Sequence, residues 1–237
     1  MALLPALSSR HLTPELMDDP SLDERRHRRA LSALRRLNRL SAADAIVWMP
    51  LRQLARVPGH PPLRVLDLAT GSGDIPLALA RRARAAALPM VIDGCDVAEL
   101  PLSIARERAK ASGHPGRFFR LDVLRERLPD YDVVMCSLFM HHLGNDEVVE
   151  VLYKMRCSAK RMVLVSDLRR CRAGYMLAAA CSRVFTRSDV ARVDALKSVR
   201  AAFTTGEFAD LAAEAGLDAA VIEPVLPCRF RLVWRRE

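Results

Sequence analysis

The pattern of hydrophobic and polar positions divides the chain into a helical beginning and a longer alternation of strands and helices. Seven segments have the length and apolar content of strands: 63–68, 90–95, 117–121, 131–137, 161–166, 219–223 and 228–234. Helical spacing of apolar residues fills three intervals between them: 74–87, 99–112 and 145–157. This order predicts an α/β fold with a doubly wound, seven-stranded and mainly parallel sheet.

The first 58 residues favour two or three helices. Ser21 to Glu24 has the pattern of a capping box that opens the first of them. The cluster of proline and glycine at 58–62 is typical of a boundary. We therefore expect an N-terminal helical cap at 1–58 and an α/β domain at 59–237. Within that domain, 169–203 has no strand pattern and predicts a helical insertion.

Charge and composition limit the classes of partner. The net charge is +9, but only four of the 37 basic residues are lysines, at 110, 154, 160 and 197, so 33 are arginines. The aromatic residues do not interleave with the arginines of the N-terminal helix, so we expect no nucleic-acid partner. No apolar run reaches the length of about 18 residues that predicts a membrane span. The six cysteines form no CxxC pair, which favours reduced, mostly buried thiols in the cytoplasm.

The glycine-rich segment after the first predicted strand carries the clearest chemical signal. Gly71 and Gly73 follow an apolar strand, and a helix begins at once, so free N–H groups border the turn. Asp96 ends the second predicted strand, where a carboxylate can accept hydrogen bonds from ribose hydroxyls. Position 76 is Pro, where a dinucleotide motif has its third glycine, and Asp74 would repel phosphates. Asp67 suits a cationic ligand such as a sulfonium.

These residues resemble the first motif of the class I S-adenosylmethionine (SAM) dependent methyltransferases. The similarity covers about 60–166 and is strongest to the quinone-biosynthesis C-methyltransferases and their small-molecule relatives. It implies a Rossmann-like fold, SAM as cofactor and S-adenosylhomocysteine as product. It also implies these cofactor contacts: Asp67, Ala69, Thr70, Gly71, Ser72, Gly73, Asp96, Val97, Asp122, Val123, Ser137 and Leu138. The alternative for Asp122 is a helix N-cap.

His141 and His142 follow the fourth predicted strand, at the edge where open α/β sheets bind ligands. An imidazole can act as a base at neutral pH, so either one is a candidate to deprotonate a methyl acceptor. The alternative is that one of them only orients the loop. We expect no metal, because no carboxylate completes a recognisable site and Asp167-Leu168 lacks the Asp-Asn pair of metal-dependent catechol methyltransferases.

Two flanking segments, 31–48 and 184–203, are expected to build the acceptor pocket. The candidate acceptor-binding residues are Arg39, Trp48 and Arg200, although Arg200 could instead form a surface ion pair with Asp194. The resemblance implies methyl transfer to a small molecule, and O-methylation of a phenolic, enolic or polyketide-derived hydroxyl is favoured. C-methylation of a quinone-like ring is the alternative, and nucleic-acid methylation is less favoured. The sequence leaves open whether the chain is a monomer or a homodimer.

Overall fold

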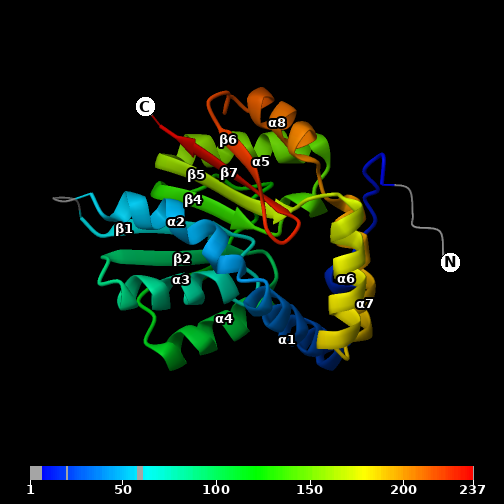
Figure 1. Ribbon diagram of the computed structural model, residues 1–237. Helices are drawn as coiled ribbons and strands as arrows, with labels where there is room; N and C mark the ends of the chain where they lie inside the picture. Colours follow the sequence, from blue (N-terminus) through cyan, green and yellow to red (C-terminus); the bar gives the residue numbers. More distant parts are fainter. Residues whose placement is uncertain (1–6, 20, 58–60, 237) are drawn as a thin grey trace.

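The computed structural model describes residues 7–19, 21–57 and 61–236 and contains one seven-stranded sheet with helices on both faces (Figure 1). The strand order is β3-β2-β1-β4-β5-β7-β6, and β7 pairs antiparallel with both of its neighbours, β5 and β6, while all other pairs are parallel. The strands are β1 (Leu63–Leu68), β2 (Met90–Asp96), β3 (Phe118–Arg120), β4 (Tyr131–Ser137), β5 (Ala159–Leu168), β6 (Val221–Val225) and β7 (Arg229–Arg235). The predicted doubly wound, mainly parallel sheet is confirmed.

The helices were also predicted largely in place. They are α1 (Glu24–Leu40), α2 (Ala43–Ala55), α3 (Asp74–Ala85), α4 (Glu99–Ser112), α5 (Asn145–Ser158), α6 (Arg172–Phe185), α7 (Asp189–Ala201) and α8 (Thr205–Glu214). Two short 3-10 turns are added, η1 (Leu16–Asp18) and η2 (Met140–His142). The predicted boundary between cap and domain falls partly on residues 58–60, which lie outside the described residues.

Alternating side chains of the strands fill two cores. Val65 of β1 and Val133 of β4 face α2 and α3, whereas Leu66 and Val134 face α5 and α8. The central strands are therefore buried on both faces, as parallel strands covered by helices are. The helix α2 belongs to the first of these cores, so part of the predicted cap packs directly on the sheet.

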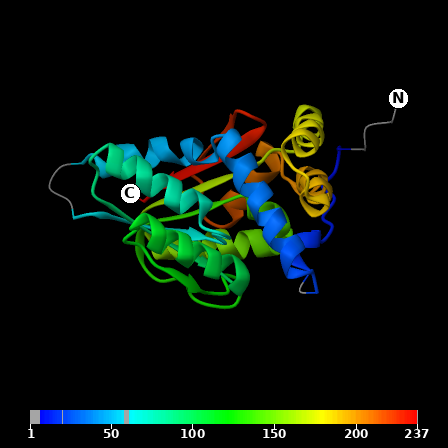
Figure 2. The ribbon, with the colours of Figure 1, turned by 90° about the horizontal axis from the view of Figure 1, so that it is seen from below.

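The helices α1, α6 and α7 lie at the carboxyl ends of the parallel strands (Figure 1). Figure 2 shows the long helix α1 beside the pair formed by α6 and α7, and all three are in contact. Ligands bind at this edge of open α/β sheets, so these helices border the candidate site.

Two expectations of local detail were wrong. Asp23, not Ser21, caps α1, because its carboxylate accepts a hydrogen bond from Arg26 N at 3.0 Å while the Ser21 hydroxyl donates to Asp19. The cysteines are free, but only Cys95 and Cys136, which lie on central strands, are buried. Cys157 is exposed because it lies on the outer side of α5.

Candidate active site

The turn between β1 and α3 has the backbone that a close-approaching ligand needs. Gly71 and Gly73 have φ angles of 54° and 71°. A side chain at Gly71 would meet nothing within 4 Å, whereas one at Gly73 would press on Phe118 at 3.0 Å. Gly71 therefore borders open space, and Gly73 allows the turn to pack on β3. Ala69 has a φ of 50°, a conformation that costs a non-glycine residue about 1–2 kcal/mol.

Asp67 is buried below this turn and has an unused acceptor atom. Its Oδ2 accepts a hydrogen bond from the Thr70 hydroxyl at 2.8 Å, while its Oδ1 has no partner in the structure. Burial raises the pKa of Asp67 to about 8. A buried carboxylate with a free oxygen fits a cationic group, because a nearby positive charge stabilises its ionised form. This observation fits the SAM sulfonium and amino group.

Asp96 connects the second strand to the same turn. Its two oxygens accept backbone N–H bonds from Gly71 at 2.7 Å and Ala98 at 2.9 Å. Each carboxylate oxygen has a second lone pair, which leaves capacity for ribose hydroxyls. The next residue, Val97, is 52% exposed, so its side chain offers an apolar surface beside Asp96.

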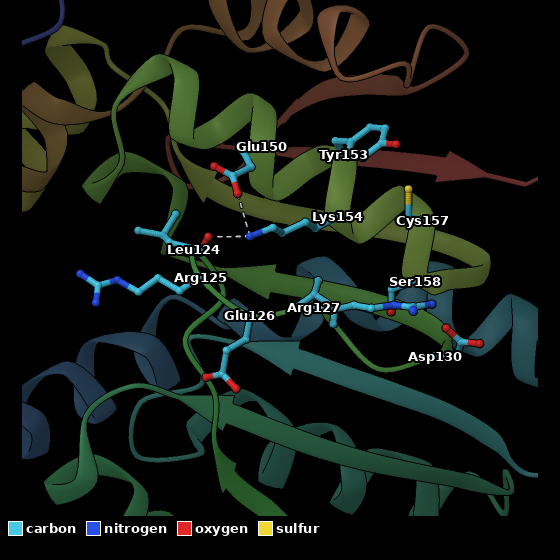
Figure 3. A pocket seen from close by; sticks show the side chains of 11 residues that line it. Leu124, Arg125, Glu126, Arg127, Asp130, Glu150, Tyr153, Lys154, Cys157 and Ser158 are labelled. Atoms are coloured by element: carbon cyan, nitrogen blue, oxygen red, sulfur yellow. Dashed lines mark hydrogen bonds and ion pairs between the residues drawn. The ribbon is translucent and has the colours of Figure 1, made fainter.

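Asp122 caps a turn and not the helix that the alternative interpretation expected. Its Oδ1 accepts hydrogen bonds from Leu124 N at 3.0 Å and Arg125 N at 3.3 Å. Lys154 of α5 holds the same turn by donating to the carbonyls of Val123 and Leu124, as Figure 3 shows for Leu124. A pocket of about 390 Å³ opens beside Lys154, but neither the glycine turn nor the histidines line it. The interactions of Lys154 with this turn and with Glu150 give it a structural role.

His141 is fixed by a carboxylate on the neighbouring strand. His141 belongs to the short turn η2, and its side chain is buried. Leu138, three residues earlier, has a φ of 58°. Asp167 at the end of β5 binds His141 twice. The His141 ring Nδ1 lies 2.6 Å from Asp167 Oδ1, and the His141 backbone N–H donates to Oδ2 at 3.1 Å. Because the two strands are adjacent and parallel, their carboxyl ends bring the histidine and the acid together.

The structure adds two acids that the sequence analysis missed. Glu15 and Asp18 lie on an N-terminal strap, which we define as residues 7–19. Glu15 Oε1 is 3.7 Å from His141 Nε2, and Asp18 Oδ2 is 3.2 Å from His142 Nδ1. The only signal in the sequence is a group of acids, Glu15, Asp18 and Asp19, just before the arginine-rich helix.

Contacts with η2 and α7 hold the strap in place. Arg10 donates to the carbonyl oxygen of His141 at 3.0 Å. Asp194 accepts hydrogen bonds from Leu16 N at 2.8 Å and Met17 N at 3.0 Å. Asp194 is therefore a buried anchor for the strap, and the expected surface ion pair with Arg200 was wrong. The reason is that Asp194 faces the strap from the inner side of α7.

The acids of the strap set the charge of the second histidine. Burial alone would lower the pKa of His142, but the hydrogen bond to Asp18 and the charge of Glu15 outweigh it and raise the pKa to about 9. His142 is thus an imidazolium at neutral pH. The pKa of Asp167 is lowered despite its burial, chiefly by the neighbouring His141.

Three possible metal ligands also meet here. Glu15, His141 and His142 each offer an atom, and these atoms lie within 4.8 Å of one another. Each residue already has a protein partner: Ser198 donates to Glu15, Asp167 binds His141, and Asp18 binds His142. These bonds hold the three side chains in place without an ion, and the absence of a metal stays a prediction.

The three candidate acceptor-binding residues do not converge. Arg39 lines a cavity of about 660 Å³ together with Asp74 and Ile75, the first residues of α3. Arg200 lines a groove of about 700 Å³ between α6 and α7. Trp48 is 8% exposed and packs in the core under α2, a position at odds with contact to an acceptor. From the sequence alone, Trp48 could lie either in the core or in an acceptor pocket. The packing of α2 on the sheet places it in the core.

Comparison with known proteins agrees with this geometry. A family profile described as "Methyltransferase domain" matches residues 65–161. A curated demethylmenaquinone methyltransferase from Thermus thermophilus is 33% identical over 132 residues, which are 54% of this chain and 58% of that protein. The chain spans about half the length of the curated relatives it matches. No described helix is long and apolar enough to cross a membrane.

Solved structures share the fold at low sequence identity. The SAM-dependent methyltransferase SibL in its apo form is 18% identical with a TM-score of 0.65, covering 97% of this chain and 64% of that one. An O-methyltransferase family 2 protein from Planctomyces limnophilus, solved with apigenin, is 16% identical with a TM-score of 0.63. The match covers 92% of this chain and 63% of that one. The fold, the glycine turn and the family match identify residues 65–161 as part of a class I SAM-dependent methyltransferase domain.

Proposed function

We propose that the chain as a whole transfers a methyl group from SAM to the oxygen of a small phenolic, enolic or polyketide-derived hydroxyl. The observation that carries this proposal is the buried pair of His141 and Asp167 at the carboxyl ends of β4 and β5. The end of β1, which leads into the glycine turn, lies directly beside β4. This position supports a role for His141 as proton acceptor beside the proposed cofactor residues of the glycine turn.

His141 is the better of the two candidate bases. If its Nδ1 donates to Asp167, its Nε2 keeps a lone pair that can take a proton. His142 is already protonated at neutral pH, so it cannot accept one. His142 instead supplies positive charge near the site, and Asp18 balances that charge.

The proposed reaction is a direct displacement. Bound SAM would supply an electrophilic methyl group on a sulfonium. His141 Nε2 removes the acceptor's hydroxyl proton, the oxygen forms the new bond to the methyl carbon, and the carbon–sulfur bond breaks. The products are the methyl ether, S-adenosylhomocysteine and a proton on His141. Asp167 and Glu15 stabilise the resulting imidazolium by their charge.

C-methylation of a quinone-like ring is the second candidate, and the name of the curated relatives favours it. The same base could deprotonate a ring hydroxyl and make a ring carbon nucleophilic. Methylation of nucleic acid has less support, because Arg26 and Arg28 of α1 pair with Asp189 and Glu24.

The test is an assay with SAM carrying a ¹³C-labelled methyl group and a panel of phenols, pyrones and hydroquinones. We expect a labelled methyl carbon with the NMR shift of a methoxy group. A labelled methyl bonded to carbon would replace O-methylation with the second candidate. Transfer to oligonucleotides but not to any small molecule would contradict both.

A further inference from the structure

The helix α6 exposes its apolar side chains and buries small residues. Its buried residues are Gly174 and Ser182, the small and polar ones. Its exposed residues include Met176, Leu177 and Val184, which are 52%, 38% and 73% exposed. A helix of a globular protein normally buries its apolar stripe and exposes its polar face. Here the apolar face points to solvent.

The exposed apolar residues form one continuous stripe. We define the α6 stripe as Ala173, Met176, Leu177, Ala180 and Val184, all exposed. Their spacing of three, four, seven and eleven positions from the first puts them on one side of the helix. Phe185 at the end of α6 is 44% exposed, and Val193 on the neighbouring helix α7 is 43% exposed. The apolar surface therefore continues beyond the stripe.

Uncompensated positive charge surrounds this stripe. Arg172, Arg183, Arg187 and Arg192 are exposed, and none forms an ion pair with an acid among the described residues. The two acids of the α6–α7 segment are directed elsewhere. Asp189 pairs with Arg26 of α1, and Asp194 binds the strap. An apolar face bordered by arginines without acidic partners is complementary to the interface of an anionic bilayer.

We propose that α6 docks on an anionic membrane surface, with the α6 stripe in the acyl boundary and the arginines at the headgroups. A second copy of this chain fits less well, because a symmetric contact through the same face would bring the arginines of both copies together. The helix α7 packs on η2, so docking would hold the histidine site close to the membrane. The proposal concerns binding alone and does not depend on methyl transfer.

The experiment is co-sedimentation of the full chain with two kinds of vesicle. One kind is phosphatidylcholine alone, and the other contains phosphatidylcholine and phosphatidylglycerol in equal parts. We expect binding to the second kind of vesicle. This binding should weaken as the salt concentration rises, because salt screens the attraction between the arginines and the anionic headgroups. Equal binding to both kinds, or to neither, would overturn the proposal.

Variants separate the apolar and the electrostatic contributions to vesicle binding. The double variant Leu177→Glu with Val184→Glu should reduce binding at least about tenfold, because two charges would enter the acyl boundary. Arg187→Glu should reduce it at least about fivefold. The matched controls are Val221→Glu on β6 and Lys160→Glu at the start of β5, both exposed and on the parts of their strands that lie away from the carboxyl edge where α6 lies. These controls should bind as the parent does, and losses equal to those of the α6 variants would contradict the assignment.

Light scattering after gel filtration tests whether a second copy of this chain, and not a membrane, covers the α6 stripe. The parent and the Leu177→Glu, Val184→Glu variant should have the same mass. If the parent is a dimer that this variant makes monomeric, while neither binds vesicles, the α6 stripe is a self-association surface and the proposal is wrong.

Discussion

Asp167 binds His141 at two points, the ring Nδ1 at 2.6 Å and the backbone N–H at 3.1 Å. One carboxylate therefore fixes both the position of the loop and the orientation of the imidazole. Such a two-point contact selects the tautomer with hydrogen on Nδ1, which keeps Nε2 free to accept a proton.

The first prediction concerns this pair. Asp167→Asn should lower kcat by about 10²–10⁴-fold, because the amide can stabilise the wrong tautomer and cannot balance an imidazolium. The dissociation constant for S-adenosylhomocysteine, measured by calorimetry, should change little. His114→Gln is the control, since His114 contacts the Ile92 carbonyl away from the site. Full activity of a folded Asp167→Asn enzyme would refute the role of His141 as a base.

The second prediction concerns pH. The pKa of His142 is about 9 in the folded chain and about 6.5 in a model peptide. The folded state therefore binds the proton more tightly, so its contribution to stability is full below pH 6.5 and is lost as the pH rises through 9. We expect the free energy of unfolding to fall by about 1–3 kcal/mol over this range, allowing for screening of a side chain that is 27% exposed.

Denaturant unfolding at a series of pH values measures this change. His142→Gln should reduce the slope between neutral and alkaline pH, and the part that remains below pH 8 belongs to Asp67, whose pKa is raised to about 8. His114→Gln should leave it in place, because burial lowers the pKa of His114. A slope that persists unchanged in His142→Gln would assign it to another group.

The third prediction links cofactor binding to a proton. The Asp67 carboxyl, with a pKa raised to about 8 by burial, is mostly protonated at pH 7. A cationic ligand beside its free oxygen favours the ionised form, so SAM binding should release a proton. Calorimetry in buffers with different ionisation enthalpies will measure this release, and Asp67→Asn should abolish it. Binding enthalpies that do not depend on the buffer would show that Asp67 keeps its charge state.

The fourth prediction concerns metal ions. Because protein partners already hold Glu15, His141 and His142 in place and the proposed reaction uses no metal, a chelator should leave the methyl-transfer rate unchanged within error. Recovery of a lost rate on adding a divalent cation would instead identify these residues as ligands.

The strands and the glycine turn were predictable because their signals are local. The strand β4 was predicted with its observed bounds, since an apolar run buried on both faces ends at a polar residue. The approach of Glu15 and Asp18 was not predictable, because the strap has no periodic pattern. Asp18 and His142 are 124 positions apart in the sequence, and only the path of α7 past η2 brings them together.

The contacts of the strap also affect the order in which parts of the protein fold during synthesis. Arg10 contacts the carbonyls of His141 and Ala201, and Glu15 contacts Ser198. The strap therefore leaves the ribosome well before its partners and has nowhere to dock until η2 and α7 have also been synthesised. A nascent chain can assemble its central strands early, but its histidines stay uncovered until the last helices arrive. The strap can thus cover the histidines only after α7 has been made.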